Sequence, residues 1–290
     1  MNAPDYLPFE AGPYRMTLGL KPLDLAEWIE IDDTLAAILR DKRRLLAARH
    51  DDVFHAVPES EAAGGEVADL LWDHLPRRFP TQYARMGATL SLAATGELVG
   101  RRHPGLHPLD LAARVVPEDL CLLEERGSEH VLTAASVCFP SRWRLADKIG
   151  RSVRDIHGPV PGYDAAIGAP VDRFFDRLDV GRPMWRLNWT LLDRDALFQP
   201  NPAEAREVAA ERFADGVFLR VERQTLRRLP RSGAILFTIR TYVRPLGALP
   251  STARARLGNA LEALPASMRA YRGLTRFADR LAIWLKSSRA

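Results

Sequence analysis

The sequence predicts an α+β fold, with an antiparallel sheet in the middle of the chain and helices before and after it. Two long alternating segments over 218–229 and 234–243 are joined by the turn-forming residues PRSG, and two shorter apolar runs over 117–139 flank a polar turn that contains glycine. Strands joined by such short turns pair antiparallel, because a parallel pair needs a long crossover connection. Apolar residues at helical spacing near both ends of the chain complete the pattern.

The first part of the chain is expected to be mainly helical. Residues 1–22 are rich in proline, glycine and aromatic side chains, which favours an irregular arm on the surface. Apolar residues recur at helical spacing over 24–49, where an acidic break at 32–34 can begin a second helix. A loop over 58–65 and then a helix over 66–78, ended by two prolines, follow.

The middle of the chain alternates between expected strands and helices. After the hairpin at 117–139, an amphipathic pattern predicts a helix over 143–157, and a second short helix is expected over 170–180. Residues 184–192 alternate between Trp or Leu on one face and polar side chains on the other, which predicts a strand. The polar segment 194–214 is expected to be helical.

Three regions follow from this order of elements. They are an N-terminal helical region over 1–115 packed on the core, a core over 116–250, and C-terminal helices over 251–290. Two strands, intervening helices and three more strands are also the element order of a PAS-type sensor domain. The sequence therefore predicts a PAS-like core, although a fold by itself carries no function.

Composition and missing motifs narrow the function. The 41 Lys and Arg residues against 37 Asp and Glu give a net charge of +4 that is spread along 290 residues, unlike the basic stripe of a nucleic-acid-binding protein. Cys121 and Cys138 form no CxxC pair for zinc or an iron–sulfur cluster. The sequence shows no secretion signal and no membrane-spanning run, which favours a cytoplasmic protein that binds neither nucleic acid nor membranes. It also has no dinucleotide-binding, P-loop, HExxH or GxSxG motif.

One of the seven histidines stands apart from the rest. His157 continues the four-residue spacing of Leu145, Ile149 and Val153, so it is expected on the apolar face at the end of the 143–157 helix, before Pro159 stops that helix. A histidine at a helix C-terminus is also favoured by the helix dipole. The pattern therefore leaves two interpretations open, a capping histidine at the edge of the core and a metal or haem ligand.

Three segments carry a resemblance to a known family. They are CFPSRWRLADKIGRSVRDIHGPVPGY over 138–163, RLNW over 186–189 and LRVERQTLRRLPRSGAILFTIRTYVRPL over 219–246. Together they resemble the haem-dependent oxidative N-demethylases, a family similar in fold to haem-binding PAS gas sensors.

The resemblance implies a cofactor and a set of partners. It implies haem b on this chain, with O2 and a small amine such as dimethylamine as substrates. It implies reductase subunits that oxidise NADPH and carry flavin and a [2Fe–2S] cluster, and a subunit that binds tetrahydrofolate to take up the one-carbon product. The missing dinucleotide motif and cluster cysteines agree with electrons arriving from such partners.

The haem expected from the resemblance needs an axial ligand, and the resemblance makes His157 the candidate for the iron. Lys148 and Arg151 are candidates for the haem propionates, and Tyr163 for the mouth of the pocket; exposed helix charges and a loop anchor are the alternatives. Asn188 and Trp189 are further candidates for binding the cofactor. Asn188 lies with Arg186 on the polar face of its strand, and Trp189, on the other face, is either a pocket wall or a core residue.

The distal side of the expected haem is assigned to the strand over 218–229. Glu222 is the candidate for holding a protonated amine, and Arg223 for polarising oxygen or pairing a propionate. These two neighbours point to opposite faces, and the pattern leaves open which face points inward. Arg240 is the candidate cofactor-binding residue on the next strand, and a solvated face with cross-strand pairs is the alternative.

The sequence thus favours a haem-dependent amine monooxygenase, an oxidative N-demethylase subunit. The alternatives are a haem-based gas or redox sensor and a small-molecule-binding protein without turnover.

Overall fold

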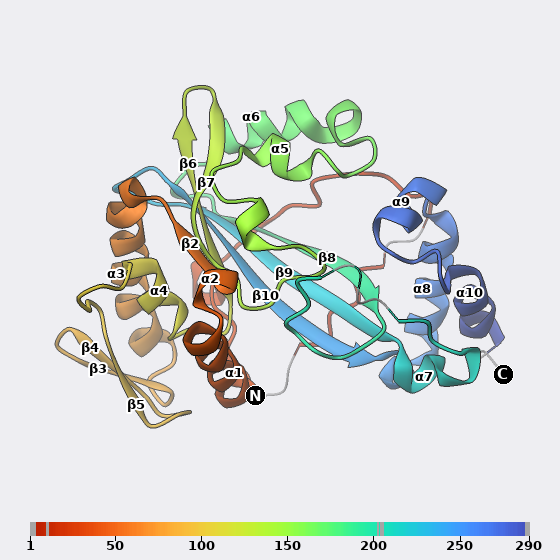
Figure 1. Ribbon diagram of the computed structural model, residues 1–290, viewed down its shortest axis with the longest axis horizontal. Coiled ribbons are helices and arrows are strands. Elements are labelled where there is room, and N and C mark those ends of the chain that lie inside the picture. The colour runs from red at the N-terminus through yellow and green to blue at the C-terminus, as the bar shows by residue number, and fades with distance from the viewer. Residues whose placement is uncertain (1–3, 10–11, 202, 204–205, 288–290) are drawn as a thin grey trace.

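A seven-stranded antiparallel sheet forms the centre of the protein (Figure 1). The computed structural model describes residues 4–9, 12–201, 203 and 206–287. In spatial order the strands are β1 (Lys21–Pro22), β8 (Met184–Leu192), β9 (Phe218–Arg228), β10 (Ile235–Pro245), β6 (Asp119–Arg126), β7 (Glu129–Ser136) and β2 (Phe54–Ala56). The expected class, a mixed α+β fold with an antiparallel sheet, is confirmed.

Helices gather at the two ends of this sheet (Figure 1). The first group contains α1 (Leu35–Ala48), α2 (His50–Val53), α3 (Glu61–Arg78) and α4 (Pro108–Ala113), beside a small sheet of β3 (Tyr83–Met86), β4 (Thr89–Leu92) and β5 (Glu97–Gly100). The second group contains α7 (Phe213–Gly216), α8 (Ser251–Ala263), α9 (Ala266–Tyr271) and α10 (Ala278–Ser287). Between the groups, α5 (Val153–His157) and α6 (Ala169–Arg177) lie together.

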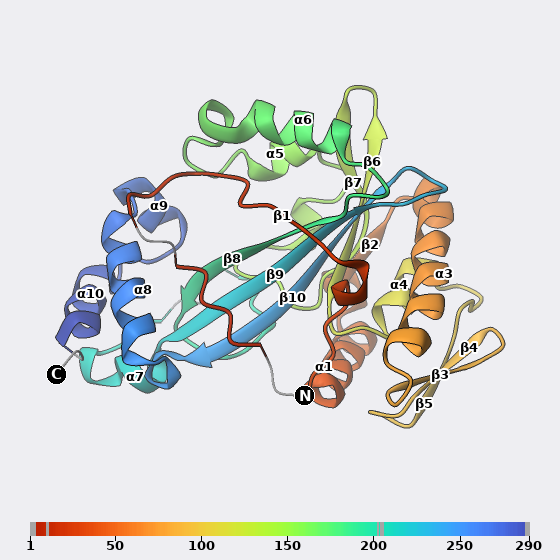
Figure 2. The same cartoon turned by 180° about the vertical axis from the view of Figure 1, so that it is seen from behind.

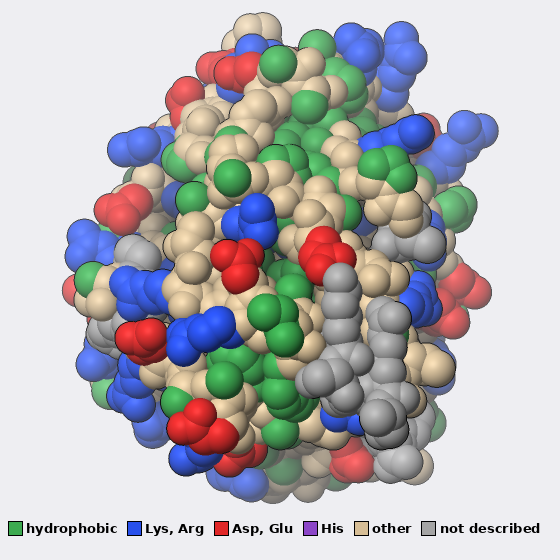
Figure 3. Space-filling model, turned by 90° about the vertical axis from the view of Figure 1, so that its right-hand side faces the viewer, with side chains coloured by type: hydrophobic (Ala, Val, Ile, Leu, Met, Phe, Trp, Pro, Cys, Tyr) green, Lys and Arg blue, Asp and Glu red, His purple; other side chains and the backbone are tan. Residues whose placement is uncertain are grey.

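The N-terminal arm runs along the back of the sheet. Figure 2 shows it passing from α9 across β8, β9 and β10 to α1. Figure 3 shows the end of the molecule that carries the C-terminal helices, where apolar side chains lie between scattered charged ones. Within the described part of the chain, no helix is both long and apolar enough to cross a membrane.

The following strands and helices, which were predicted from turn residues and from alternating or helical spacing, are confirmed. Both hairpins form where the sequence places them, as β6–β7 and β9–β10, and Leu229 and Ala234 hydrogen-bond across the second turn. The alternating segment after Pro183 is β8, and the described residues of the arm are irregular apart from the two in β1. Helix α6 and the C-terminal helices are confirmed as well.

The helix expected over 143–157 is wrong, because the chain pairs with β7 in the middle of it. Gly150 adopts a positive φ of 76° and donates its N–H to the carbonyl of Leu132, whose own N–H bonds to Arg151 O. Only a short 3-10 turn precedes this point, and α5 begins anew at Val153. The four-residue spacing that ends at His157 is therefore not one helical stripe.

Two further expectations are corrected, and one region was missed. The described residues of the segment 194–214 are mostly irregular, and the buried Asp193 carboxylate fastens them by accepting the N–H of Arg206 and a guanidinium N–H of Arg142. Helix α3 begins at Glu61, inside the expected loop. It continues through Pro76, which was expected to end it, as far as Arg78. The small sheet and α4 were not predicted from the sequence.

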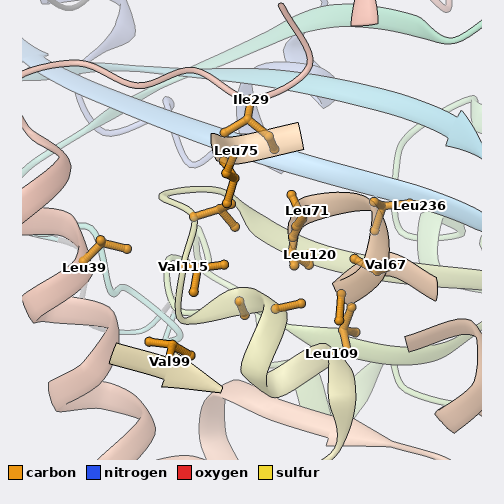
Figure 4. Close-up of a cluster of buried hydrophobic side chains, with 14 of the residues drawn as sticks. Ile29, Leu39, Val67, Leu71, Leu75, Val99, Leu109, Val115, Leu120 and Leu236 are labelled. Carbon is orange, nitrogen blue, oxygen red and sulfur yellow. The ribbon is translucent and has the colours of Figure 1, made fainter. Parts of the chain in front are cut away.

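The largest apolar core lies between the N-terminal helices and the sheet (Figure 4). Val67, Leu71 and Leu75 come from one face of α3 at spacings of four residues, and all are fully buried. They meet Leu120 of β6 and Leu236 of β10. At about 25 cal/mol per Å² of apolar area removed from water, such packing supplies the main stabilisation of this end of the fold.

Buried polar groups join α1 to the start of β6. Lys42, fully buried, donates to the backbone carbonyls of Val116 and Glu118. The Glu118 carboxylate accepts the N–H of Glu30 at 2.9 Å through one oxygen, while the other has no partner among the described residues. Burial raises the pKa of Glu118 from its ordinary value of 4.5 to about 7, although Arg240 acts in the opposite direction.

Because the folded chain holds the Glu118 proton more tightly than the unfolded chain, its contribution to stability is present at acid pH. It is lost as the pH rises from about 4.5 to about 7, by about 3 kcal/mol at most. Glu118→Gln is expected to remove this part of the pH dependence, measured by urea unfolding from pH 4.5 to 8. Glu125→Gln, at an exposed position, is the control. An unchanged pH profile in the Glu118 variant would contradict the burial effect.

Candidate functional site

His157 ends the short helix α5 with one ring nitrogen fixed and the other free. Ser152 caps the helix by accepting the N–H of Asp155 at 3.2 Å. The Nδ1 of His157 lies 2.8 Å from the carbonyl oxygen of Val153, so Nδ1–H is the donor and Nε2 carries a lone pair. The ring stacks on Tyr163, with centroids 5.1 Å apart and planes 12° from parallel. Among the described residues, none hydrogen-bonds to Nε2.

The surroundings lower the pKa of this imidazole. His157 is an exposed residue, yet the protein packed around its ring lowers its pKa by desolvation. The hydrogen bond to Val153 opposes this effect, and the positive charges of Lys148 and Arg186 reinforce it. A neutral imidazole with its second nitrogen held by a backbone carbonyl is the form that binds a metal.

The neighbouring candidates take different places around this ring. Lys148 donates to Ile156 O at 3.3 Å, and its ammonium lies 5.0 Å from the centre of the Trp143 ring. The Tyr163 hydroxyl is buried and has no hydrogen-bond partner among the described residues, and burial raises its pKa to about 12. Arg151 is exposed.

Polar side chains from β8 and β9 share one face of the sheet. Asn188 lies directly opposite Glu222, and Arg186 directly opposite Gln224, so all four point to the same side. The Glu222 carboxylate accepts hydrogen bonds from Asn188 at 3.3 Å, from Gln224 at 3.0 Å and from Arg220 at 2.9 Å. We call Arg186, Asn188, Glu222 and Gln224 the polar face.

The polar face remains partly open although it lies in the middle of a sheet. All four of its side chains are half-buried, whereas Arg220 is 1% exposed. Burial lowers the pKa of Arg186, the negative charge of Glu222 raises it, and Arg272 lowers it. The positive charge of Arg186 in turn lowers the pKa of His157.

Apolar residues line the same side of the sheet beside His157. They form a buried cluster with the half-buried Ile149, Ile156 and Val160 packed against it. Members from the sheet are Cys121, Leu123, Leu132, Ala135, Leu226 and Ile235, and members from the crossing segments are Val137, Leu145, Val153, Tyr163, Val171, Phe175 and Leu178. An apolar wall beside a free imidazole nitrogen suits a large flat macrocycle.

Arg223, Arg240 and Trp189 lie on the opposite face of the sheet. Arg223 donates to the carbonyl of Glu27 at 2.6 Å and lies 3.2 Å from the Glu30 carboxylate. Arg240 pairs with Asp32 at 2.8 Å, and both side chains are almost fully buried. Trp189 packs edge-on against Phe9 of the arm. The structure therefore brings His157, Lys148, Tyr163, Asn188 and Glu222 to one side, and it places these other three residues behind the sheet.

Comparison with known families adds a chemical identity to this geometry. The family model described as haem-dependent oxidative N-demethylase, alpha subunit-like, matches residues 19–282. The chain belongs to this family. Membership implies dependence on haem and the presence of other subunits.

The residues of this N-demethylase family member fit a haem. His157 offers a free Nε2, the apolar cluster offers a dry wall, and the buried Tyr163 hydroxyl without a partner marks a place for a polar group of a ligand. Positive side chains for the two propionates lie nearby. The described residues contain no group of three or more His, Cys, Asp or Glu side chains placed to hold a bare metal ion.

Sequence reasoning assigned no function to two residues near this site, Arg186 and Arg272. The alternating pattern places Arg186 on the same face of its strand as Asn188. Nothing in that pattern distinguishes Arg186 from an arginine that points into solvent. Arg272 lies 86 positions further on, just after α9, and only the fold brings it to β8. The one signal in the sequence is that neither arginine has an acidic residue beside it in the chain that could pair with it.

The charge pairs behind the sheet generate a stability prediction. Asp32→Ala leaves the Arg240 guanidinium buried without its carboxylate and is expected to cost about 3–5 kcal/mol of unfolding free energy. Asp41→Ala, which removes a largely exposed pair with Arg44, is the control and is expected to cost less than about 1 kcal/mol. Urea unfolding measures both.

The double variant Asp32→Leu with Arg240→Met tests the cause. Because both charges are removed together, it is expected to recover most of the lost stability. Equal stability of Asp32→Ala and Asp41→Ala would contradict the pairing.

Proposed function

We propose that this chain is the haem b subunit of a monooxygenase that oxidatively removes a methyl group from a small secondary amine of the dimethylamine type. In the overall reaction one oxygen atom of O2 leaves in formaldehyde and the other in water, with two electrons and two protons consumed. The electrons come from NADPH through partner subunits with flavin and a [2Fe–2S] cluster. A further subunit with tetrahydrofolate accepts the one-carbon product. The core over 116–250 is proposed to be PAS-like.

One observation carries the proposal. An imidazole whose Nδ1 is held by the Val153 carbonyl, leaving Nε2 free, faces the same side of the sheet as a carboxylate held by three donors, in a chain whose family is haem-dependent. Haem supplies the binding and activation of dioxygen and the passage of single electrons. The residues of this chain would hold it through His157, with the Val153 carbonyl fixing the orientation of the ring.

Glu222 is proposed to bind the substrate. A secondary amine is protonated at neutral pH, and a carboxylate holds it by a charge-assisted hydrogen bond. Arg220, Asn188 and Gln224 fix the Glu222 carboxylate in one orientation, so little freedom is lost when the amine binds. Arg223 and Arg240 are proposed to support the sheet from behind, through their contacts with Glu27 and Asp32, rather than to touch the substrate.

The first test addresses the haem ligand. His157→Ala is expected to lose or greatly weaken haem, because Nε2 is the proposed axial nitrogen; haem titration followed at the Soret band measures this. His103→Ala, at an exposed position, is the control and should bind haem as the wild type does. An unchanged spectrum and stoichiometry in His157→Ala would remove His157 from the site.

The second test addresses the amine. Glu222→Gln keeps the shape of the side chain but removes the charge, so it is expected to weaken dimethylamine binding about tenfold or more while haem remains bound. The measurement is an amine titration of the haem spectrum, with Glu129→Gln at an exposed position as control. Wild-type affinity in the Glu222 variant would contradict its role.

Turnover separates the enzyme from a haem-based sensor. Formaldehyde released from dimethylamine, in the presence of O2 and an electron donor, supports the monooxygenase. Haem binding without formaldehyde release, with the same donor shown to reduce the haem, would favour the sensor.

A further inference from the structure

Tyr163 lies flat against the imidazole of His157. The two ring centroids are 5.1 Å apart, and the ring planes are 12° from parallel. Tyr163 is buried in the apolar cluster, with 4% of the residue exposed, whereas His157 is an exposed residue. The tyrosine is therefore the fixed member of the pair, and the histidine ring rests on it.

A tight loop returns the chain from His157 to Tyr163. The N–H of Val160 donates to the carbonyl of His157 at 2.8 Å, and the N–H of Tyr163 donates to the carbonyl of Val160 at 3.1 Å. Gly162 has a φ of 76°, in the left-handed region, where a side chain would strain the backbone. The backbone of this loop thus places the tyrosine ring on the imidazole.

The segment after Tyr163 is tied to the helix that carries His157. A π-helical turn over Asp164–Gly168 follows directly, and such turns are rare and lie frequently at functional sites. Arg154 of α5 lies 3.5 Å from the Asp164 carboxylate and 2.5 Å from that of Asp172 in α6. Each of these exposed pairs contributes little by itself, but both join α5 to the segment that holds the tyrosine.

The stack restricts a rotation that the hydrogen bond of His157 leaves open. The side-chain rotation of a histidine about its Cβ–Cγ bond has broad energy minima. The Val153 carbonyl, 2.8 Å from Nδ1, holds one atom of the ring. A flat neighbour that is nearly parallel to the ring holds its plane as well. Because the lone pair of Nε2 lies in that plane, the two contacts together determine its direction.

We propose that Tyr163 is a positioning residue, which fixes the plane of the His157 ring and thereby aims Nε2 at the haem iron. Groups behind a metal ligand orient it in this way, and the affinity for the metal depends on them. The part of the inference that concerns haem rests on the proposed function, and the part that concerns the ring itself does not.

The first measurement uses the chain without haem. In the wild type, the proton of the neutral His157 ring is expected on Nδ1, because the Val153 carbonyl accepts it. Tyr163→Leu removes the flat neighbour and is expected to add a measurable share of the Nε2–H form, since the imidazole can then turn away from that carbonyl. Nitrogen NMR of isotope-labelled histidines, at a pH where the rings are neutral, distinguishes the two forms, and His157→Ala assigns the signal.

The second measurement uses haem. Tyr163→Leu is expected to raise the Kd for haem about 10- to 100-fold, which is the usual loss when a residue that orients a metal ligand is replaced. An absorbance titration at the Soret band measures this. The iron–imidazole stretching band of the reduced form, recorded by resonance Raman spectroscopy, is expected to shift in the same variant.

Two variants are matched controls. Tyr163→Phe keeps the flat ring and is expected to keep the Nδ1–H form and the wild-type Raman band. Phe213→Leu removes a buried aromatic ring from the core beside the C-terminal helices, where it packs edge-on against Trp284. It is expected to lower stability but to leave the His157 ring, the Raman band and the Kd for haem unchanged.

A wild-type ring signal in Tyr163→Leu would overturn the inference, and unchanged haem affinity and Raman band in that variant would overturn the aiming of Nε2. Changes in Phe213→Leu as large as those in Tyr163→Leu would also overturn it, because they would reflect lost stability. Loss of the Nδ1–H form in Tyr163→Phe would assign the effect to the hydroxyl and not to the stack. A wild-type chain that binds no haem would overturn the proposed function instead, and the NMR measurement would still decide whether Tyr163 fixes the ring.

Discussion

Buried arginines on the back of the central sheet are the constraint on which the rest of the site depends. Arg223 and Arg240 lie directly opposite each other on β9 and β10, and both are buried. A buried guanidinium without a partner is very costly, so these strands fold only where the segment between β1 and α1 supplies carboxylates and carbonyls. Glu30 and Asp32 do so. Because side chains alternate along a strand, burying Arg223 on the back forces Glu222 to the front.

The front face combines polar groups that are satisfied with others that are not. Glu222 has three donors and therefore a fixed position, while Arg186 and the Tyr163 hydroxyl have buried polar atoms without partners. Atoms of this kind also occur on the back of the sheet, for example the Nε of Arg240, and each marks a place that a ligand or water can complete. The position of Tyr163 beside a histidine with a free Nε2 and an apolar wall is what a family dependent on haem would need. The back of the sheet provides rigidity, and the front provides binding groups.

Long-range pairing explains where the sequence patterns failed. The apolar spacing before His157 is compatible with one helix, but Gly150 and Arg151 hydrogen-bond to Leu132 of β7 and break it. Local propensity contains no information on a strand that lies 20 positions earlier in the chain. The same holds for the irregular segment after β8, which is fixed by the buried Asp193 rather than by its own helix-forming residues.

The sequence by itself determined the α+β class, both long hairpins, the terminal helices and the residue types of the candidate site, because period-two alternation and turn residues are local signals. It also determined that Glu222 and Arg223 point to opposite faces. Only the tertiary structure decided which face is which, since that choice depends on contacts of Trp28 and Asp32 with β9 and β10, which follow 195 and 208 positions later in the chain. It alone placed Arg272 next to β8, because a contact between distant segments is set by packing and burial and not by neighbours in the chain.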